Sequence, residues 1–491
     1  MANTLNWHDS GGQAELRLAS NLPPPGIAPT SPVTGPSHYA LSVLTTEQAA
    51  YKLAFQIADA LIRSGAGSAN TTKSLLSIFR KTDLRDVTVS VGLGQVTISH
   101  QDAPDKAPST RVFESQPGTL DIQLRTDTGE VLEDFVLGRI SAEEGIQRMD
   151  EILAESRHIG HRLTVTGFGM FGVGFALILG GSWPTAITAA IVSAAVYGVY
   201  ALVQRVKAPE VFSLAAGGLT AVLGVTVAGV LFDITQTAVC IVAALAAWLA
   251  GIAAYGAVHD VITGWYVSAS GRIFEAITST AGLVAGVTIG IHAMRPLVGD
   301  SVDYIETLKM DDSRWALTVL GAAVVSAGFA LASGGRGWKL ASLGLFGGLV
   351  QLGTLAITAT GISSFGAILI ASIVAGILSV TLTRALNLAS NATLMVVLLP
   401  LFPGMLVYQG VLGVIFGLED AGENVLEAAI TAFCLCMGGM LGQYVASEIL
   451  WAGRRRQFVR HHPGQKFRRE MANEENFSDI MVPIFSKPFT S

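Results

Sequence analysis

Long apolar stretches dominate the chain between residues 163 and 450, and short polar segments separate them. Most of the stretches approach the roughly 20 residues that an α-helix needs to cross the hydrocarbon core of a bilayer. The pattern therefore predicts an all-α polytopic membrane region with ten transmembrane helices. The expected spans cover residues 163–181, 183–203, 211–231, 236–258, 273–293, 315–333, 338–359, 363–383, 392–417 and 426–450.

The residues before the first span follow two other periodicities, which predict a cytoplasmic α+β domain over residues 46–160. Apolar residues recur at helical spacing in three segments and alternate with polar residues in three others. Residues 1–45 are rich in Pro, Gly, Ser and Thr, which predicts a disordered N-terminal segment. The expected helices cover 46–63, 70–80 and 141–156, and the expected strands cover 86–91, 96–99 and 120–124.

Polar or helix-breaking residues interrupt the apolar pattern in two places. Residues 259–264 (His-Asp-Val-Ile-Thr-Gly) follow the fourth stretch, and residues 400–404 (Pro-Leu-Phe-Pro-Gly) lie inside the ninth. A helix broken at membrane depth frees backbone groups, which is tolerated where the break is buried in protein or lines a watery cavity. Two breaks at corresponding places in two halves of a membrane protein are typical of a transporter site. We therefore expect a solute transporter.

A polar loop at residues 294–314 divides the expected spans into two sets of five, over residues 161–293 and 315–450. Because five is odd, the second half would enter the membrane from the opposite side, and homologous halves would form an inverted repeat. The segment that starts at Asp260 resembles the segment that starts at Pro400, 140 residues later. The similarity favours an inverted repeat with the substrate bound at the interface of its halves.

Composition and charge indicate a membrane protein with one preferred orientation. Of the 491 residues, 51% are hydrophobic and 14% are charged, against roughly 25% charged in soluble proteins. Most Lys and Arg residues between the spans fall on one side, which predicts that both termini, including the basic tail at 451–491, are cytoplasmic. No secretory signal peptide is visible, so we expect the first span to act as its own targeting signal.

The sequence offers little for metal, redox or nucleotide chemistry. Cys240, Cys434 and Cys436 all lie in expected spans, with no spacing for a zinc site or a disulfide framework. No phosphate-binding loop is present, so we expect transport driven by an ion gradient and not by ATP. We also expect no cofactor and no metal. The expected partners are a small substrate, protons and the lipid bilayer, with no nucleic acid. Homo-oligomer formation stays open.

Acidic residues near the first interruption are candidates for proton coupling. An acid at membrane depth is costly and usually marks an ion or substrate pathway, so Asp260 is the first candidate. The alternative is that Asp260 lies at the membrane surface and caps a helix. Arg272 and Glu275 are three residues apart, which also suits a simple ion pair. In a functional role, Glu275 would couple to protons and Arg272 would bind one end of a zwitterionic substrate.

The two interruptions also supply the candidates for substrate binding. Broken helices expose backbone groups at their ends, and these attract the charged groups of a ligand. A tyrosine and a glutamine follow the second break by one turn and could add hydroxyl and amide contacts. A simple proline kink is the alternative. The candidate substrate-binding residues besides Arg272 are Thr263, Gly264, Pro403, Gly404, Tyr408 and Gln409.

Glycines recur every four residues in two of the spans, which predicts close helix packing. In the first of these spans the glycines are Gly282, Gly286 and Gly290, and in the second they are Gly438 and Gly442. Several segments, taken in order, are similar to one known family. The segments are 260–264 (DVITG), 268–275 (SASGRIFE), 282–290 (GLVAGVTIG), Pro403-Gly404 with Tyr408, and 64–66 (SGA) with Thr71-Thr72.

On these residues the chain resembles the bacterial threonine/serine exporter family over about residues 46–450. The resemblance implies export of threonine and serine driven by the proton motive force. The family also includes relatives made of two chains, one for each half of the membrane region, and these are linked to dicarboxylate export.

Other functions stay open from the sequence. A dicarboxylate exporter would need cationic side chains facing its cavity, for which Arg272 and Arg384 are the candidates. A membrane-anchored hydrolase would carry its activity in residues 46–160, and a passive channel would ignore a proton gradient. We expect an antiporter that exports amino acids, not an enzyme.

Overall fold

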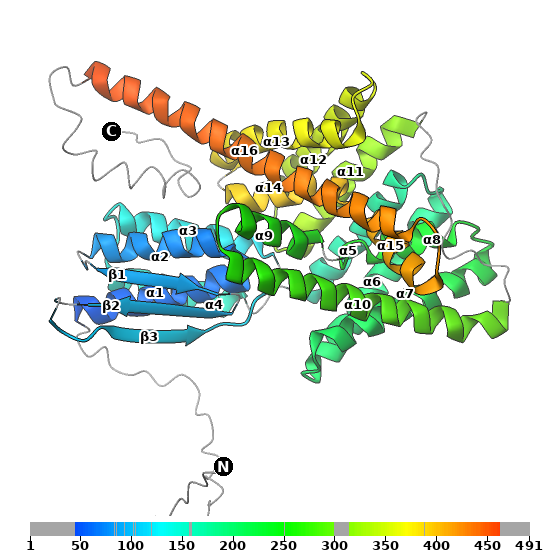
Figure 1. Cartoon of the computed structure of the whole chain (residues 1–491), viewed down its shortest axis with the longest axis horizontal. Helices are drawn as coiled ribbons and strands as arrows, with labels where there is room; N and C mark the ends of the chain where they lie inside the picture. The colour runs from blue at the N-terminus through cyan, green and yellow to red at the C-terminus, as the bar shows by residue number, and fades with distance from the viewer. Residues whose placement is uncertain are drawn as a thin grey trace, which may run out of the picture. The chain divides into compact units, whose positions relative to one another are not determined.

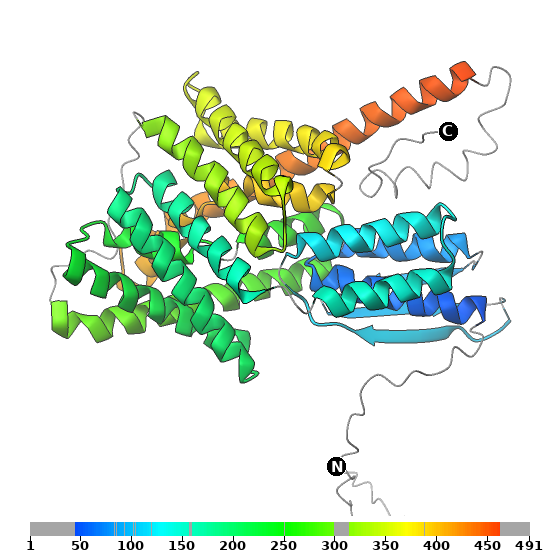
Figure 2. The same cartoon turned by 180° about the vertical axis from the view of Figure 1, so that it is seen from behind.

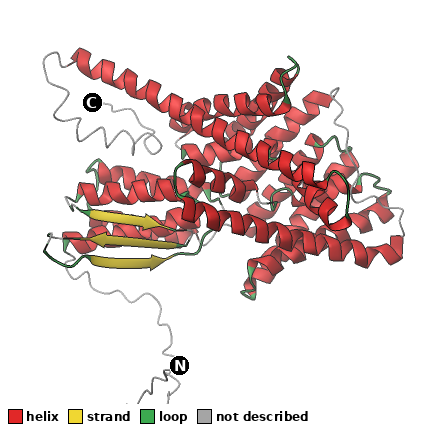
Figure 3. Cartoon of the chain, viewed as in Figure 1, coloured by secondary structure: helices red, strands yellow, loops and turns green. Residues whose placement is uncertain are grey.

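The computed structural model describes residues 45–461, apart from 83, 85, 93, 102, 104, 119, 157–159, 250, 299–313 and 387. Its strands all lie before residue 160, and only helices and loops follow (Figures 1 and 3). The segment expected to be disordered, 1–45, lies outside the described residues except for its last residue. Most of the loop at 294–314 and the tail beyond 461 lie outside them as well.

The N-terminal domain consists of a three-stranded antiparallel sheet and four helices (Figures 1 and 2). In the central strand Val96 and Ile98 are buried and alternate with half-buried residues, as expected when helices cover one face of a sheet. Burial of each such side chain stabilises the fold by about 1.5–3 kcal/mol. The elements are α1 (Thr46–Arg63), α2 (Ser68–Lys81), β1 (Val87–Val91), β2 (Gln95–His100), β3 (Ser109–Glu114), α3 (Ile122–Val136) and α4 (Ala142–Ser156).

The domain differs from the sequence prediction at one element and adds another. The expected strand at 120–124 is wrong, because α3 begins there. The Asp121 carboxylate accepts a hydrogen bond from the Leu124 N–H at 2.9 Å and caps the helix. Buried residues continue at helical spacing with Thr128 and Val131. The third strand is β3, whose polar sequence gave no clear alternation of apolar residues.

The helical region contains eight helices that are long and apolar enough to span a membrane, or up to nine if one bent pair counts as a single span, among the described residues. The bent pair is α14 with α15, at the ninth expected span. The fourth expected span, 236–258, consists of two shorter helices, α8 and α9. The helices are α5 (His161–Ile178), α6 (Trp183–Arg205), α7 (Glu210–Phe232), α8 (Thr237–Leu245), α9 (Gly251–Ile262), α10 (Tyr266–Val298), α11 (Trp315–Ala332), α12 (Trp338–Thr358), α13 (Ser364–Leu386), α14 (Ser390–Leu398), α15 (Gly404–Phe416) and α16 (Ala421–His461). Because α16 continues to His461, the boundary expected at residue 450 falls inside a helix.

The order and lengths of the helices recur in the two halves. Each half has three long helices, a 9-residue helix, a helix of 12 or 13 residues, and a final long helix. The start residues of corresponding helices are 153–155 positions apart. The pairs of start residues are His161 and Trp315, Trp183 and Trp338, Glu210 and Ser364, Thr237 and Ser390, Gly251 and Gly404, and Tyr266 and Ala421.

The first helices of the two halves, α5 and α11, pack against each other through glycines. A Cβ on Gly174 would lie 2.5 Å from the Gly321 carbonyl oxygen, and a Cβ on Gly321 would lie 2.6 Å from that of Gly174. No side chain fits at such a distance, so the backbones touch. The expected packing role of Gly286 and Gly442 is confirmed, because each lies against a neighbouring backbone, on α7 and α13 respectively.

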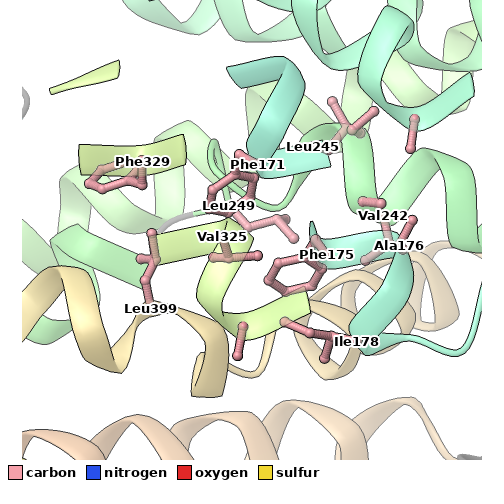
Figure 4. Close-up of a cluster of buried hydrophobic side chains, with 14 of the residues drawn as sticks. Phe171, Phe175, Ala176, Ile178, Val242, Leu245, Leu249, Val325, Phe329 and Leu399 are labelled. Carbon is pink, nitrogen blue, oxygen red and sulfur yellow. The ribbon is translucent and has the colours of Figure 1, made fainter. Parts of the chain in front are cut away.

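Aromatic and aliphatic side chains from both halves fill the centre of the helical region (Figure 4). Phe171 and Phe175 of α5 stack with their ring centroids 5.6 Å apart, and Phe171 also contacts Phe329 of α11. Leu249 and Leu399, which lie at interruptions between short helices, belong to the same cluster. The core therefore holds together the two places where the chain leaves helical geometry.

Candidate functional site

Two interrupted helices occupy corresponding positions in the two halves of the helical region. In the first half α8 ends at Leu245 and α9 begins at Gly251. In the second half α14 is followed by a 3-10 turn, η5 (Leu399–Leu401), and α15 begins at Gly404. The axes of the second pair differ by 60°. The break expected between Pro400 and Gly404 is therefore present.

The two interruptions share one local backbone geometry. The N–H of Gly404 donates to the carbonyl oxygen of Phe402 at 2.8 Å, and the N–H of Gly251 donates to the carbonyl oxygen of Leu249 in the same way. Pro403, between Phe402 and Gly404, has φ −78° and ψ 50°, close to an inverse γ-turn. After each short turn a new helix begins, and the first N–H groups of that helix have no intrahelical partner.

Each interruption packs onto the glycine of the other. A Cβ on Gly251 would lie 3.0 Å from the Phe402 ring, and a Cβ on Gly404 would lie 3.4 Å from a methyl group of Leu249. In both cases the residue two positions before one glycine covers the other glycine. Glycine at these positions therefore lets the two turns approach closely.

A cavity of about 410 Å³ lies beside the two turns, between α10 and α16. That volume falls in the range of small-molecule sites, roughly 300–1,000 Å³. Its wall includes Gly251, Phe402, Pro403 and Gly404 and is otherwise mostly aliphatic and aromatic. Among the described residues on this wall, Thr280 of α10 is the one polar side chain, and none is charged. Charged groups of a ligand would therefore meet backbone groups at the helix ends.

A second cluster surrounds Asp260, where α9 and α10 meet the N-terminal domain. The Asp260 side chain is fully buried. Its Oδ2 accepts hydrogen bonds from the Ser268 hydroxyl at 2.9 Å and from Arg272 Nε at 3.1 Å. A second nitrogen of Arg272 donates to the Ala66 carbonyl oxygen at 3.0 Å, and Ser68 and Ser268 share a hydrogen bond of 2.6 Å. We call this cluster the junction.

The other carboxylate oxygen of Asp260 has no hydrogen-bond partner among the described residues. The nearest polar atom given for it is His259 Nδ1, at 3.6 Å, which also lacks a partner. A Cβ on Gly67 would lie 3.3 Å from this oxygen, so the α1–α2 loop closes over it. A buried carboxylate oxygen without a donor is a place where a proton can bind.

The candidate residues from the sequence divide between the two sites. Pro403 and Gly404 line the cavity, whereas Asp260 and Arg272 lie in the junction. Thr263 and Gly264 do not line this cavity with Pro403 and Gly404, so the cavity does not bring the two predicted breaks together. The Thr263 hydroxyl donates to carbonyl oxygens of its own helix, and Gly264, at φ +83°, turns the chain between α9 and α10.

The remaining candidates occupy other surroundings. Arg272 pairs with Asp260 and not, in any described contact, with Glu275. Arg272 and Glu275 line a separate cavity of about 20 Å³ at the junction, large enough for one or two waters. Tyr408 is buried in the core, and Gln409 is half-buried, so neither lines the large cavity. The described residues include no group of three His, Cys, Asp or Glu side chains that could hold a metal ion.

Pro403 and Gly404 are the candidates from the sequence that line this cavity, and most of its other residues were not predicted. Leu249, Gly251 and Thr280 are among them, and Phe402 was identified as part of the break but not for its packing on Gly251. The first break contains no proline and lies in the segment Ala-Ala-Trp-Leu-Ala-Gly, residues 246–251. The offset of 153 residues between Gly251 and Gly404 is the signal that could have located it. The prediction used an offset of 140 residues instead and aligned Asp260 with Pro400.

Comparisons with known proteins agree on one family. The family model described as a putative threonine/serine exporter matches residues 52–294, and the model of the threonine/serine exporter ThrE matches residues 318–445. A probable threonine/serine exporter of Mycobacterium tuberculosis is 25% identical over 412 residues, which cover 82% of this chain and 77% of that protein. A threonine/serine exporter of Corynebacterium glutamicum is 24% identical over 485 residues, 96% of this chain and 94% of that protein. No solved structure matches the chain. The matching proteins are named as exporters and not as enzymes.

Proposed function

Because this chain belongs to the threonine/serine exporter family, we propose that it exports threonine and serine by proton antiport. The observation that carries the proposal is the cavity of about 410 Å³ beside two helix interruptions that pack onto each other. Transporters commonly bind substrate where discontinuous helices of two repeats meet near the middle of the bilayer. The membrane would be the bacterial cytoplasmic membrane, with both termini and the N-terminal domain in the cytoplasm.

The cavity would hold the substrate mainly through backbone groups. The N-terminal ends of α9 and α15 present the positive ends of helix dipoles. Beyond Gly251 and Gly404, whose N–H groups are already bonded, the next N–H groups have no intrahelical partner and suit the carboxylate of an amino acid. Carbonyl groups at the ends of α8 and α14 suit the ammonium group. The Thr280 hydroxyl would bind the hydroxyl group of threonine or serine, while Phe402 and Ile252 contact its aliphatic part.

Alternating access would come from movement of one half against the other. The recurrent helix order at offsets of 153–155 residues supports two homologous halves, which an odd number of spans each would make an inverted repeat. The reciprocal contacts between Leu249 and Gly404, and between Phe402 and Gly251, would close the cavity on one side. Small rotations of the halves would exchange which side is closed.

Proton coupling would act through the junction. Proton binding at the open oxygen of Asp260 would neutralise the carboxylate and weaken its bond to Arg272, which also holds the Ala66 carbonyl. The α1–α2 loop would then be released from α10. Glu275 faces the same small cavity as Arg272 and is the second proton-coupling candidate.

The test is efflux of labelled threonine from proteoliposomes, with and without an imposed pH gradient. The wild type should show gradient-driven efflux, and Asp260→Asn should lose it while retaining exchange of threonine for threonine. Asp233→Asn is the matched control, because Asp233 is an exposed acid at the end of α7. Flux that ignores the gradient in the wild type would indicate a passive channel, and absence of threonine flux would refute the substrate.

Dicarboxylate export is less well supported. No described residue on the cavity wall is a Lys or an Arg, and Arg272 is engaged with Asp260. The side chain of Arg384 lies outside the described residues. In the efflux assay, succinate should therefore fail to compete with threonine.

A further inference from the structure

A second cavity, of about 90 Å³, lies where the N-terminal domain meets the start of α14. Its wall is formed by Leu61 of α1, by Ala66 of the α1–α2 loop, by α2, by one face of α3 and by residues 388–391. None of the residues on its wall lines the cavity at the helix interruptions. By the rule of roughly 10–15 Å³ for each water-sized group, it holds about six to nine such groups. That is the size of a small amino acid.

Arg125 of α3 is a buried cation on this wall, which also carries Lys73, Glu130 and Glu133. Its side chain is only 7% exposed, and its Nε has no hydrogen-bond partner among the described residues. A guanidinium group carries five N–H donors, and a buried donor without an acceptor is costly. Burial, followed by the nearby charge of Arg272, lowers the pKa of Arg125 to about 10, although Asp121 opposes this shift. An anion in the cavity would accept a hydrogen bond from Nε and would stabilise the charged guanidinium group.

The remaining polar groups on the wall suit more than a simple anion. Ser74 and Ser390 are buried, and Asn70 and Asn391 add amide groups from two different elements. A buried carboxylate, Glu133, also reaches the wall, 3.8 Å from Arg139. Such a set of hydroxyl, amide and carboxylate groups can bind an ammonium group and a hydroxyl group. An inorganic anion has no ammonium group that could pair with these acceptors.

We propose that this cavity binds a small hydroxylated amino acid, whose carboxylate pairs with Arg125, at a site separate from the transport cavity. The carboxylate follows from Arg125, whereas the choice of threonine or serine rests on the proposed function. Ala66 lies on the wall, and its carbonyl accepts the hydrogen bond from Arg272. A bound amino acid would therefore stabilise the junction from the side of the N-terminal domain, so the amino acid would regulate its own export.

The test is hydrogen–deuterium exchange of the full-length protein in lipid nanodiscs, measured on peptides that cover α3. At a threonine concentration about three times Kd, exchange through local opening should slow about fourfold. The protection should persist in Gly404→Leu, which narrows the transport cavity. It should disappear in Arg125→Gln and in Gly129→Leu.

Gly129→Leu separates binding from folding. Gly129 lies on the cavity wall inside α3, and a Cβ there meets nothing within 4 Å. Leucine would therefore fill the cavity without a clash and would favour the helix. Arg148→Gln is the matched control for Arg125→Gln, because Arg148 is a half-buried arginine of the same domain that lies outside the cavity wall, and its replacement should leave the protection unchanged.

Three results would overturn the proposal. The first is that threonine protects α3 in Arg125→Gln and in Gly129→Leu as well as in the wild type. The second is that threoninamide, which lacks the carboxylate, protects α3 as well as threonine does. The third is that inorganic phosphate protects α3 as well as threonine does. Protection of α3 in a protein that shows no threonine efflux would refute the proposed function and leave this site standing. Threonine efflux without protection of α3 would refute this site and leave the proposed function standing.

Discussion

The cavity at the helix interruptions and the junction around Asp260 differ in how they treat charge. The described wall of the cavity has no charged side chain, and at Gly251 and Gly404 side chains of the opposite turn pack onto the glycine. The junction buries an ion pair, Asp260 with Arg272, whose second bond fixes a loop of another domain. A neutral wall of backbone groups can bind a zwitterion without a charged side chain that must lose its water each time substrate binds.

The difference teaches where each kind of substitution should act. A buried ion pair contributes little net stability, because the cost of taking both charges out of water offsets their attraction. Removal of one partner is costly, because it leaves the other charge buried and unpaired. Substitution cannot remove the backbone groups that line the cavity. A substitution there acts instead through the volume that the new side chain adds. Changes of charge should therefore affect the junction, and changes of size should affect the cavity.

The largest effect is expected for Arg272→Gln in the junction. It would leave the fully buried Asp260 carboxylate without its cation, which should destabilise the protein by about 3–5 kcal/mol. The double variant Asp260→Asn, Arg272→Gln removes both charges and should recover most of that loss. Denaturant or thermal unfolding of the purified protein measures both. Equal stability of the single and double variants would show that the pair is not coupled.

The next effect is expected for Gly251→Leu in the cavity. The new side chain would meet the Phe402 ring, since a Cβ alone would already lie 3.0 Å from it. Overpacking should cost about 1–3 kcal/mol, and threonine efflux should fall at least about tenfold as the cavity narrows. Gly198→Leu, at an exposed helix position with open space around it, is the control. Normal efflux by Gly251→Leu would remove the cavity from the transport path.

A smaller effect is expected for Thr280→Val, which keeps the shape of the side chain and removes its hydroxyl. One lost hydrogen bond is worth about 0.5–1.5 kcal/mol, so the preference for threonine over an analogue without a hydroxyl should fall about two- to tenfold. Competition of threonine and 2-aminobutyrate for efflux measures the preference. Thr288→Val is the control, because Thr288 lies on the same helix and bonds to the Val284 carbonyl. An unchanged ratio would assign the hydroxyl contact elsewhere.

The smallest effect is expected for Asp121→Asn in the N-terminal domain. Burial raises the pKa of Asp121 above 3.8, so the folded state binds its proton more tightly than the unfolded state. The resulting stability is present at low pH and is lost as pH rises through the folded-state pKa. Asparagine also caps helices well, so the variant should match or slightly exceed the wild type at pH 7. Unfolding between pH 4 and pH 7 should then show a flatter pH profile for the variant, and an identical profile would contradict this account.

The parts of the fold that depend on local sequence could be predicted. The helix at 46–63 has the bounds of α1, and the break in the ninth span follows from prolines that cannot continue a helix. The break between α8 and α9 could not be predicted in this way, because its residues are mostly good helix formers. Its position depends on Phe402, 151 residues further along, whose ring packs against Gly251.

The candidate site was predicted in its residue types more than in its grouping. Asp260 and Arg272 were both singled out, but neighbours in sequence suggested an Arg272–Glu275 pair. In the structure, α9 and α10 turn back on each other at Gly264, which brings Arg272 to a partner 12 residues before it. Arg125 gave no signal in the sequence, since its burial results from the contact between two domains.

The crossed contacts between the two interruptions also constrain evolution. A Cβ at position 251 would crowd the Phe402 ring at 3.0 Å, whereas a Cβ at position 404 would touch Leu249 at 3.4 Å with no room for a longer side chain beyond it. A long side chain at either glycine would have to be accompanied by a smaller one across the interface, about 150 positions away in the same gene. Homologous sequences should therefore vary at these positions in pairs, as though each half of an ancient duplication still selects the residues of the other.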